Sequence, residues 1–199
     1  MKRGGTRMPS GTWARVILAA FVSLTIREGT LSARSPAAGS APLLAAAPNQ
    51  SLTFAVGDKV QVADVTREGM TDADISLRSF PGHLRGHVGG EPVDLRLEPR
   101  RVAGTLGNHA VGLDVIRSGA RLEVAGTFGV RAVAMSISRH SIEAQIGPCD
   151  YRLPLSSGHY RGVVTCGDGP ADVDLSIPVA LVARDDRELA AMLTALLAR

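Results

Sequence analysis

A two-strand unit recurs through the second half of this chain and constrains the fold more than any other feature. Five copies begin at Gly86, Gly104, Gly126, Ala144 and Gly162, so successive copies are 18, 22, 18 and 18 residues apart. A period this short indicates one small supersecondary unit that packs against its own neighbours. The architecture of the chain should therefore follow from the structure of a single unit.

Within each copy the apolar residues fall on alternate positions, with polar residues such as Asp94 and Arg96 between them. The alternating apolar series include Val93, Leu95 and Leu97; Val111, Leu113 and Val115; Leu122, Val124 and Phe128; Val133, Met135 and Ile137; and Tyr151, Leu153 and Leu155. A period of two with one apolar side is typical of an antiparallel sheet that is covered on one face, and it excludes a helix.

The connectors between these segments are short. Most leave four residues between the last apolar position of one strand and the first of the next, at 98–101, 107–110, 129–132, 138–141, 147–150 and 156–159. Connectors of this length allow hairpins, whereas a parallel crossover needs a dozen or more residues. The sequence therefore predicts an up-and-down meander built from hairpin repeats.

The alternation continues upstream, and we expect its apolar members to lie on the same covered face. They are Leu52, Phe54 and Val56; Val60 and Val62; Ile75 and Leu77; and Leu84 and Val88. We expect about a dozen strands of roughly five to seven residues in one domain over residues 52–183. The fold class is all-β with one C-terminal helix, and the sheet is rolled or barrel-like so that its apolar face is hidden.

The N-terminus has the pattern of a targeting segment. Four basic residues precede an apolar run over residues 16–26, which suits a signal peptide and is too short to span a bilayer. We assign residues 1–33 to this segment and the Ala- and Pro-rich residues 34–51 to a disordered linker. The alternatives are a cytosolic protein with an N-terminal extension, or a start at Met8. The export interpretation leaves the mature chain without a transmembrane span.

The net charge of +3 comes from the first 28 residues, which hold five of the 22 basic and one of the 19 acidic residues. From residue 29 onward the balance is 17 minus 18, or −1. A near-neutral domain has no electrostatic footprint for a phosphate backbone, so nucleic acid is not expected as a partner.

The two cysteines, Cys149 and Cys166, should face each other. If the hairpin is centred between Ser157 and Gly158, Tyr151 is opposite Val164, and two further steps bring the cysteines together. A two-residue turn would place the two cysteines at a non-hydrogen-bonded position, whereas a four-residue loop would place them at a hydrogen-bonded position. If the protein is exported, as its N-terminus predicts, a structural disulfide is favoured over two free thiols.

The central position of every second strand is small, namely Gly86, Gly104, Gly126, Ala144 and Gly162. The segment 184–199 then changes to a helical period, with a stripe of leucines and with acids at its start. One interpretation is that these small residues form a groove in which the leucine stripe packs on the apolar face. The other is that they mark the sharp curvature of a closing barrel, while the helix plugs one end.

No motif for catalysis, metal binding or a cofactor is found. His83 and His87 would be about 13 Å apart on a straight strand, too far for a shared ion. Asp168, Asp172 and Asp174 lack the spacing of a calcium loop, as does the Asp72–Asp74 pair. Nucleophile elbows and phosphate-binding loops are also missing from the sequence.

We therefore expect an exported, non-enzymatic β-repeat domain that acts as a structural or interaction module of the cell envelope, with a protein or other envelope component as its partner. The alternative is a carrier that encloses an apolar ligand or lipid in the barrel. A hydrolase-type enzyme is a third possibility, and its site would have to combine His83, His87 and the connector that contains Asp168.

Overall fold

The computed structural model describes residues 51–198 of the chain. The predicted targeting segment and all of the predicted linker except Ser51 lie outside the described residues, and the predicted domain boundaries stay predictions. The strands are β1 (Ser51–Val56), β2 (Lys59–Val65), β3 (Gly69–Thr71), β4 (Ile75–Phe80), β5 (His83–Val88), β6 (Glu91–Glu98), β7 (Arg101–Leu106), β8 (His109–Ser118), β9 (Arg121–Phe128), β10 (Arg131–Ser138), β11 (Ser141–Ile146), β12 (Cys149–Ser156), β13 (His159–Cys166) and β14 (Gly169–Ser176). Two helices follow, α1 (Val179–Val182) and α2 (Asp186–Leu197).

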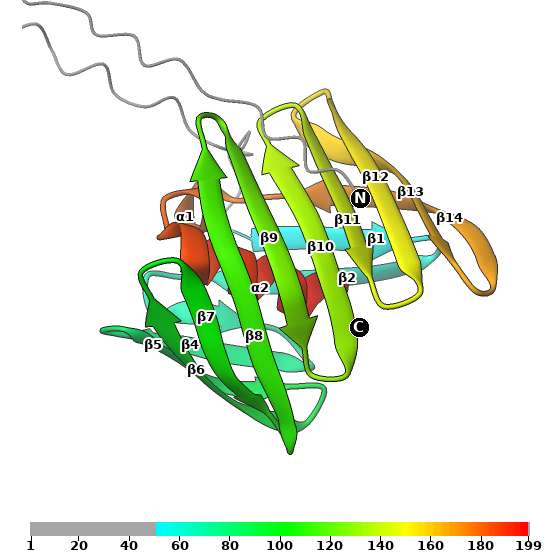
Figure 1. Ribbon diagram of the computed structural model, residues 1–199. Helices are drawn as coiled ribbons and strands as arrows, with labels where there is room; N and C mark the ends of the chain where they lie inside the picture. Colours follow the sequence, from blue (N-terminus) through cyan, green and yellow to red (C-terminus); the bar gives the residue numbers. More distant parts are fainter. Residues whose placement is uncertain (1–50, 199) are drawn as a thin grey trace, which may run out of the picture. The chain divides into compact units, whose positions relative to one another are not determined.

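The fourteen strands form a closed antiparallel barrel in which each strand pairs with its neighbours in sequence (Figure 1). The barrel closes between the first and last strands, where Thr53 is opposite Ser176 and Val56 is opposite Val173. The predicted all-β meander is therefore confirmed. Its closure removes the two open edges that a flat sheet of this size would expose.

The core of the barrel contains the alternate apolar residues predicted from the sequence. The rings of Phe128, Tyr151 and Tyr160 are all buried, as are the aliphatic side chains at the inward positions of the long strands. The prediction is wrong for Val60 and Val62, which are 64% and 55% exposed. The reason is the tight turn after β1, which places Val56 opposite Lys59 and so directs the valines of β2 outward.

Helix α2 runs through the interior of the barrel (Figure 1). All nine residues from 189 to 197 are buried, including Ala190, Ala191 and Thr194 on the sides away from the leucine stripe. A helix that is buried on every side is enclosed by its surroundings. The helix thus fills the interior of the barrel, and the predicted one-sided contact describes only part of its packing.

The N-terminal end of α2 is fixed to one end of the barrel by polar contacts. Asp185 caps the helix, and its side chain accepts a hydrogen bond from Arg187 N at 2.9 Å. The Arg187 guanidinium also bonds Asp185, which lowers the pKa of that carboxyl. Arg187 further donates to the carbonyl oxygens of Leu97 and Glu98 at 3.1 and 3.0 Å. These bonds satisfy backbone groups at the end of the barrel and set the depth of the helix.

A second arginine joins the helix to β4, which is separated from β6 by β5 alone. Arg184, whose side chain is 6% exposed, donates to Ser79 Oγ at 2.6 Å and forms an ion pair with Glu188. It also donates to the carbonyl oxygen of Thr66. Since a buried charge is costly unless it is paired, this cluster holds α2 against the strands around Ser79.

The four glycines at the central positions are explained by strand contacts. A Cβ added at Gly86, Gly104, Gly126 or Gly162 would overlap a backbone carbonyl oxygen of the neighbouring strand. The nearest atoms at each position belong to the sheet and none belongs to α2. Close approach of neighbouring strands at glycine is typical of a sharply bent sheet, so these contacts favour the curvature interpretation, which stays a prediction. A packing groove that includes Ala144 stays a prediction.

Candidate functional site

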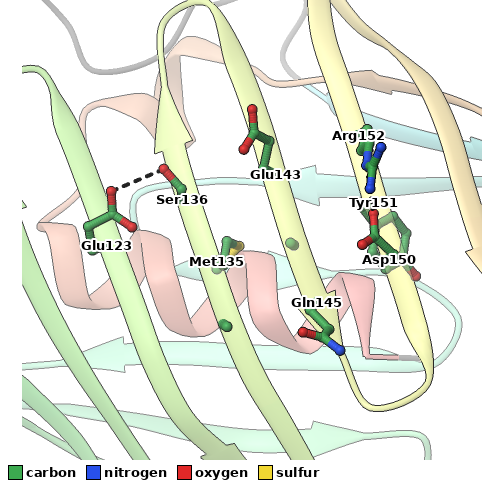
Figure 2. A pocket seen from close by; sticks show the side chains of 10 residues that line it. Glu123, Met135, Ser136, Glu143, Gln145, Asp150, Tyr151 and Arg152 are labelled. Atoms are coloured by element: carbon green, nitrogen blue, oxygen red, sulfur yellow. Dashed lines mark hydrogen bonds and ion pairs between the residues drawn. The ribbon is translucent and has the colours of Figure 1, made fainter.

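Because α2 occupies the interior, the surface that this barrel offers to other molecules is its outer face and its two ends. One hollow of about 530 Å³ lies on the outer face over β9 to β12. We call it the outer groove. Its polar lining consists of Glu123, Ser136, Glu143, Gln145, Asp150 and Arg152 (Figure 2).

Strand register brings these side chains into two rows. In the first row, Glu123, Ser136, Glu143 and Arg152 are successive partners on β9, β10, β11 and β12. A second row places Gln145 opposite Asp150 and next to an alanine on β10. Residues of one row project from the same side of the sheet, so the lining follows from alternation and hairpin register together.

The groove carries few contacts among its own polar groups. Ser136 Oγ donates to Glu123 Oε1 at 3.1 Å, drawn as the dashed line in Figure 2. Arg152 Nε donates to Asp150 Oδ1, also at 3.1 Å, but the Arg152 side chain is 80% exposed. Three carboxylates and one guanidinium give the groove a net charge of −2. Exposed groups of this kind contribute little to stability, and they remain available for hydrogen bonds and ion pairs with another molecule.

The described residues contain one histidine–carboxylate pair at hydrogen-bond distance. His159 Nδ1 lies 3.1 Å from Asp174 Oδ1, and Arg161 Nε donates to the other oxygen of the same carboxylate at 2.7 Å. A catalytic arrangement would add a nucleophile bonded to the imidazole. Within residues 51–198, no hydroxyl or thiol is recorded at hydrogen-bond distance from the His159 ring. His159, Arg161 and Asp174 thus form one partly exposed polar cluster on β13 and β14.

The residues considered for an enzyme or metal site are not brought together. His83 and His87 lie on β5, whereas Asp172 and Asp174 lie on β14, and β1 to β4 separate these strands. Asp72 is used in its own turn, where its Oδ1 accepts bonds from the backbone N–H groups of residues 74 and 75 at 2.6 Å each. In the part of the chain that the structure describes, no group of three or more His, Cys, Asp or Glu side chains is placed to hold a metal ion.

Cys149 and Cys166 form a disulfide between β12 and β13. The predicted register is confirmed, since Tyr151 is opposite Val164, and the hairpin has a two-residue turn because Ser156 is opposite His159. This decides between the two turn lengths left open by the sequence, and it places the cysteines at a non-hydrogen-bonded position.

A further hollow of about 500 Å³ lies at the end of the barrel where α2 finishes. Its lining includes the apolar residues Val88, Leu106 and Phe128 and the charged residues Glu91 and Arg131. A hollow that combines apolar and charged lining residues can hold a small molecule.

No helix within residues 51–198 is long and apolar enough to cross a membrane.

Alternation alone did not identify the outer groove. The polar residues between the apolar positions were visible in the sequence, but a polar residue on a solvated strand face is the usual case. Only the register shows that Glu123, Glu143 and Asp150 lie over adjacent strands around one hollow.

No protein-family model matches this sequence, and no curated protein or solved structure matches it either.

Proposed function

We propose that this chain is an exported, non-enzymatic β-barrel module that binds a partner in the cell envelope through the polar outer groove over β9 to β12. The observation that carries the proposal is the contrast between the interior and this surface. The interior is filled by α2, whereas the groove holds exposed charges with few and solvent-exposed contacts of their own. Binding energy at such a surface comes from side chains that gain partners only in a complex.

Export is part of the same proposal. A disulfide joins Cys149 to Cys166, and disulfides persist mainly in oxidising compartments. The basic and apolar pattern of residues 1–33 has the order of a signal peptide. Fractionation of expressing cells, with mass spectrometry of the N-terminus, tests this part. Recovery of the uncleaved chain in the cytosol alone would contradict it.

Charge reversal in the groove tests the binding site. Glu143→Lys should reduce capture of the envelope partner at least about fivefold, because exposed charges at an interface control encounter and specificity. Glu68→Lys is the matched control, since Glu68 is an exposed acid on the turn between β2 and β3. Partners captured from envelope extract would be quantified by isotope-labelled mass spectrometry. Equal capture by both variants would rule out the outer groove.

The apolar hollow at the end of α2 favours a second candidate function, the binding of a small apolar ligand or lipid. Such a ligand would sit at the barrel end beside Leu106 and Phe128. Mass spectrometry of an organic extract of the purified protein would detect it. Leu106→Arg should remove the bound molecule while Glu143→Lys leaves it in place. An extract with no bound lipid from either host or native cells would exclude this function.

A further inference from the structure

Strand β2 is unpaired along one side in the part that follows the β1–β2 turn. On one side all of its residues from Lys59 to Asp64 pair with β1. On the other side lies β3, which has only three residues. The ladder between β2 and β3 consists of two pairs, Asp64 with Thr71 and Val65 with Met70. No strand of residues 51–198 pairs with Val60 or Val62 on this side.

The turn geometry shows which backbone groups face the gap. Val56 and Lys59 flank a two-residue turn and form a hydrogen-bonded pair, so Lys59 and every second residue after it direct their N–H and C=O groups toward β1. Val60 and Val62 direct theirs the other way. We call these four groups, two N–H and two C=O, the β2 edge.

The side chains at this edge are apolar and exposed. Val60 and Val62 project from the outer face with 64% and 55% of their surface accessible, next to Ala55 on β1. Lys59 and Gln61 take the inward positions of the same strand. Other strands carry single exposed apolar side chains, such as Ile116 on β8 and Val163 on β13, whereas β2 has two in succession on its outer face. An exposed apolar edge with free backbone groups is a template for another strand.

The surrounding charge selects the kind of strand. Three acids lie near the edge, namely Asp58 and Asp64 on the β1–β2 hairpin and Asp72, which follows the Thr71 that is opposite Asp64. With Lys59 as the one base among them, the sum is 1 − 3, or −2. A second copy of this chain would bring the same negative charge. Antiparallel pairing of Val60 with Val62 of that copy would place Asp58 opposite Asp64, and like charges directly opposite each other are destabilising.

We infer that the β2 edge accepts an extended, basic peptide segment of a partner protein by strand addition, independently of the outer groove. The incoming strand forms backbone hydrogen bonds with Val60 and Val62. Its β-branched residues pack on the two valines, and its Lys or Arg residues at either end meet the acids of the β1–β2 hairpin, Asp58 and Asp64.

The test uses the isotope-labelled full-length chain and two synthetic peptides. One is acetyl-Lys-Val-Thr-Val-Lys-amide, and its control is the same peptide with Glu in place of Lys. We expect the basic peptide to shift the backbone amide signals of Val60 and Val62 and to slow their hydrogen exchange. The acidic peptide should bind at least about tenfold more weakly.

Val62→Pro gives the sharpest variant, because it removes an N–H that points away from β1 and proline is tolerated on such an edge. We expect it to lose the basic peptide, and Val62→Thr, which keeps the N–H, to retain it. If the proline variant does not fold, Val60→Lys serves in its place. It should weaken binding of the basic peptide about tenfold by charge repulsion.

Three results would overturn the inference. The first is a basic peptide that shifts amides elsewhere and leaves Val60 and Val62 unchanged. The second is equal affinity for the two peptides. The third is sedimentation that shows a dimer of this chain which Val60→Lys dissociates, since the occupant of the edge would then be a second copy.

Discussion

Replacement of Gly126 by alanine is the most direct test of why the barrel curves. Gly126 lies on β9 with φ +145°, a value that residues with a side chain rarely adopt. The added methyl carbon would overlap the carbonyl oxygen of Gly112 on β8 and lie 3.0 Å from its carbonyl carbon and 3.1 Å from Leu113 Cα. Since these are backbone atoms, a rotamer change cannot relieve the overlap, and β8 and β9 must separate.

The expected loss of stability has two parts. Holding alanine at this φ costs about 1–3 kcal/mol. Opening the ladder beside Gly112 weakens two backbone hydrogen bonds, each with a net contribution of about 1 kcal/mol. The sum is about 4 kcal/mol, which corresponds to a decrease in Tm of about 10 °C for a domain of roughly 150 residues. Denaturant unfolding followed by circular dichroism, together with calorimetry, measures both quantities.

Gly119→Ala is the matched control on the turn between the same two strands. Gly119 also has a positive φ, +59°, but a Cβ there would have no atom within 4 Å. It should therefore pay only the conformational cost, about 1 kcal/mol. If both variants lose the same stability, close approach of β8 and β9 is not the reason for glycine at position 126, and our account of the curvature is wrong.

Three other predictions concern the interior and the disulfide. Ala191→Leu should destabilise the barrel by about 1–3 kcal/mol in denaturant unfolding, because α2 is enclosed where Ala191 lies; no loss would mean that this side of the helix is open. Burial raises the pKa of Tyr151, so its stabilising effect is complete below the ordinary pKa near 10 and is lost as pH rises through the higher folded value. Tyr151→Phe should abolish that alkaline loss and cost about 1 kcal/mol at neutral pH from the missing bond to Leu197 O, and an unchanged alkaline profile would contradict the assignment. Replacing Cys149 and Cys166 with alanine removes a crosslink of sequence separation 17 and should lower the free energy of unfolding by about 3 kcal/mol relative to the oxidised protein. The chemically reduced protein should be as unstable as this variant.

Local pattern was sufficient to predict much of this molecule. The two-residue alternation predicted which side of the repeated strands is buried, and the short connectors required antiparallel neighbours. Together they gave the register of a single hairpin closely enough to pair Cys149 with Cys166. These features depend on residues that are close in sequence, so one repeat contains the information.

The same local reasoning failed at β2. The spacing of Val60 and Val62 matched the apolar alternation of the other strands, but the tight turn at Gly57 and Asp58 shifted the register by one residue. A slip of one residue in a strand moves every side chain to the opposite face. The outer groove and the β2 edge were hidden for a related reason, since each depends on which side chains and backbone groups become neighbours across strands.

What the sequence by itself determined is the repeating hairpin, its buried side and the helical period of residues 184–199. Only the tertiary structure decided that fourteen strands close on themselves and that α2 lies within them. Closure pairs Thr53 with Ser176, and it depends on the summed curvature of every strand between them. The sequence of a single repeat does not determine that sum. The enclosed space that holds the helix exists only after β14 has paired with β1.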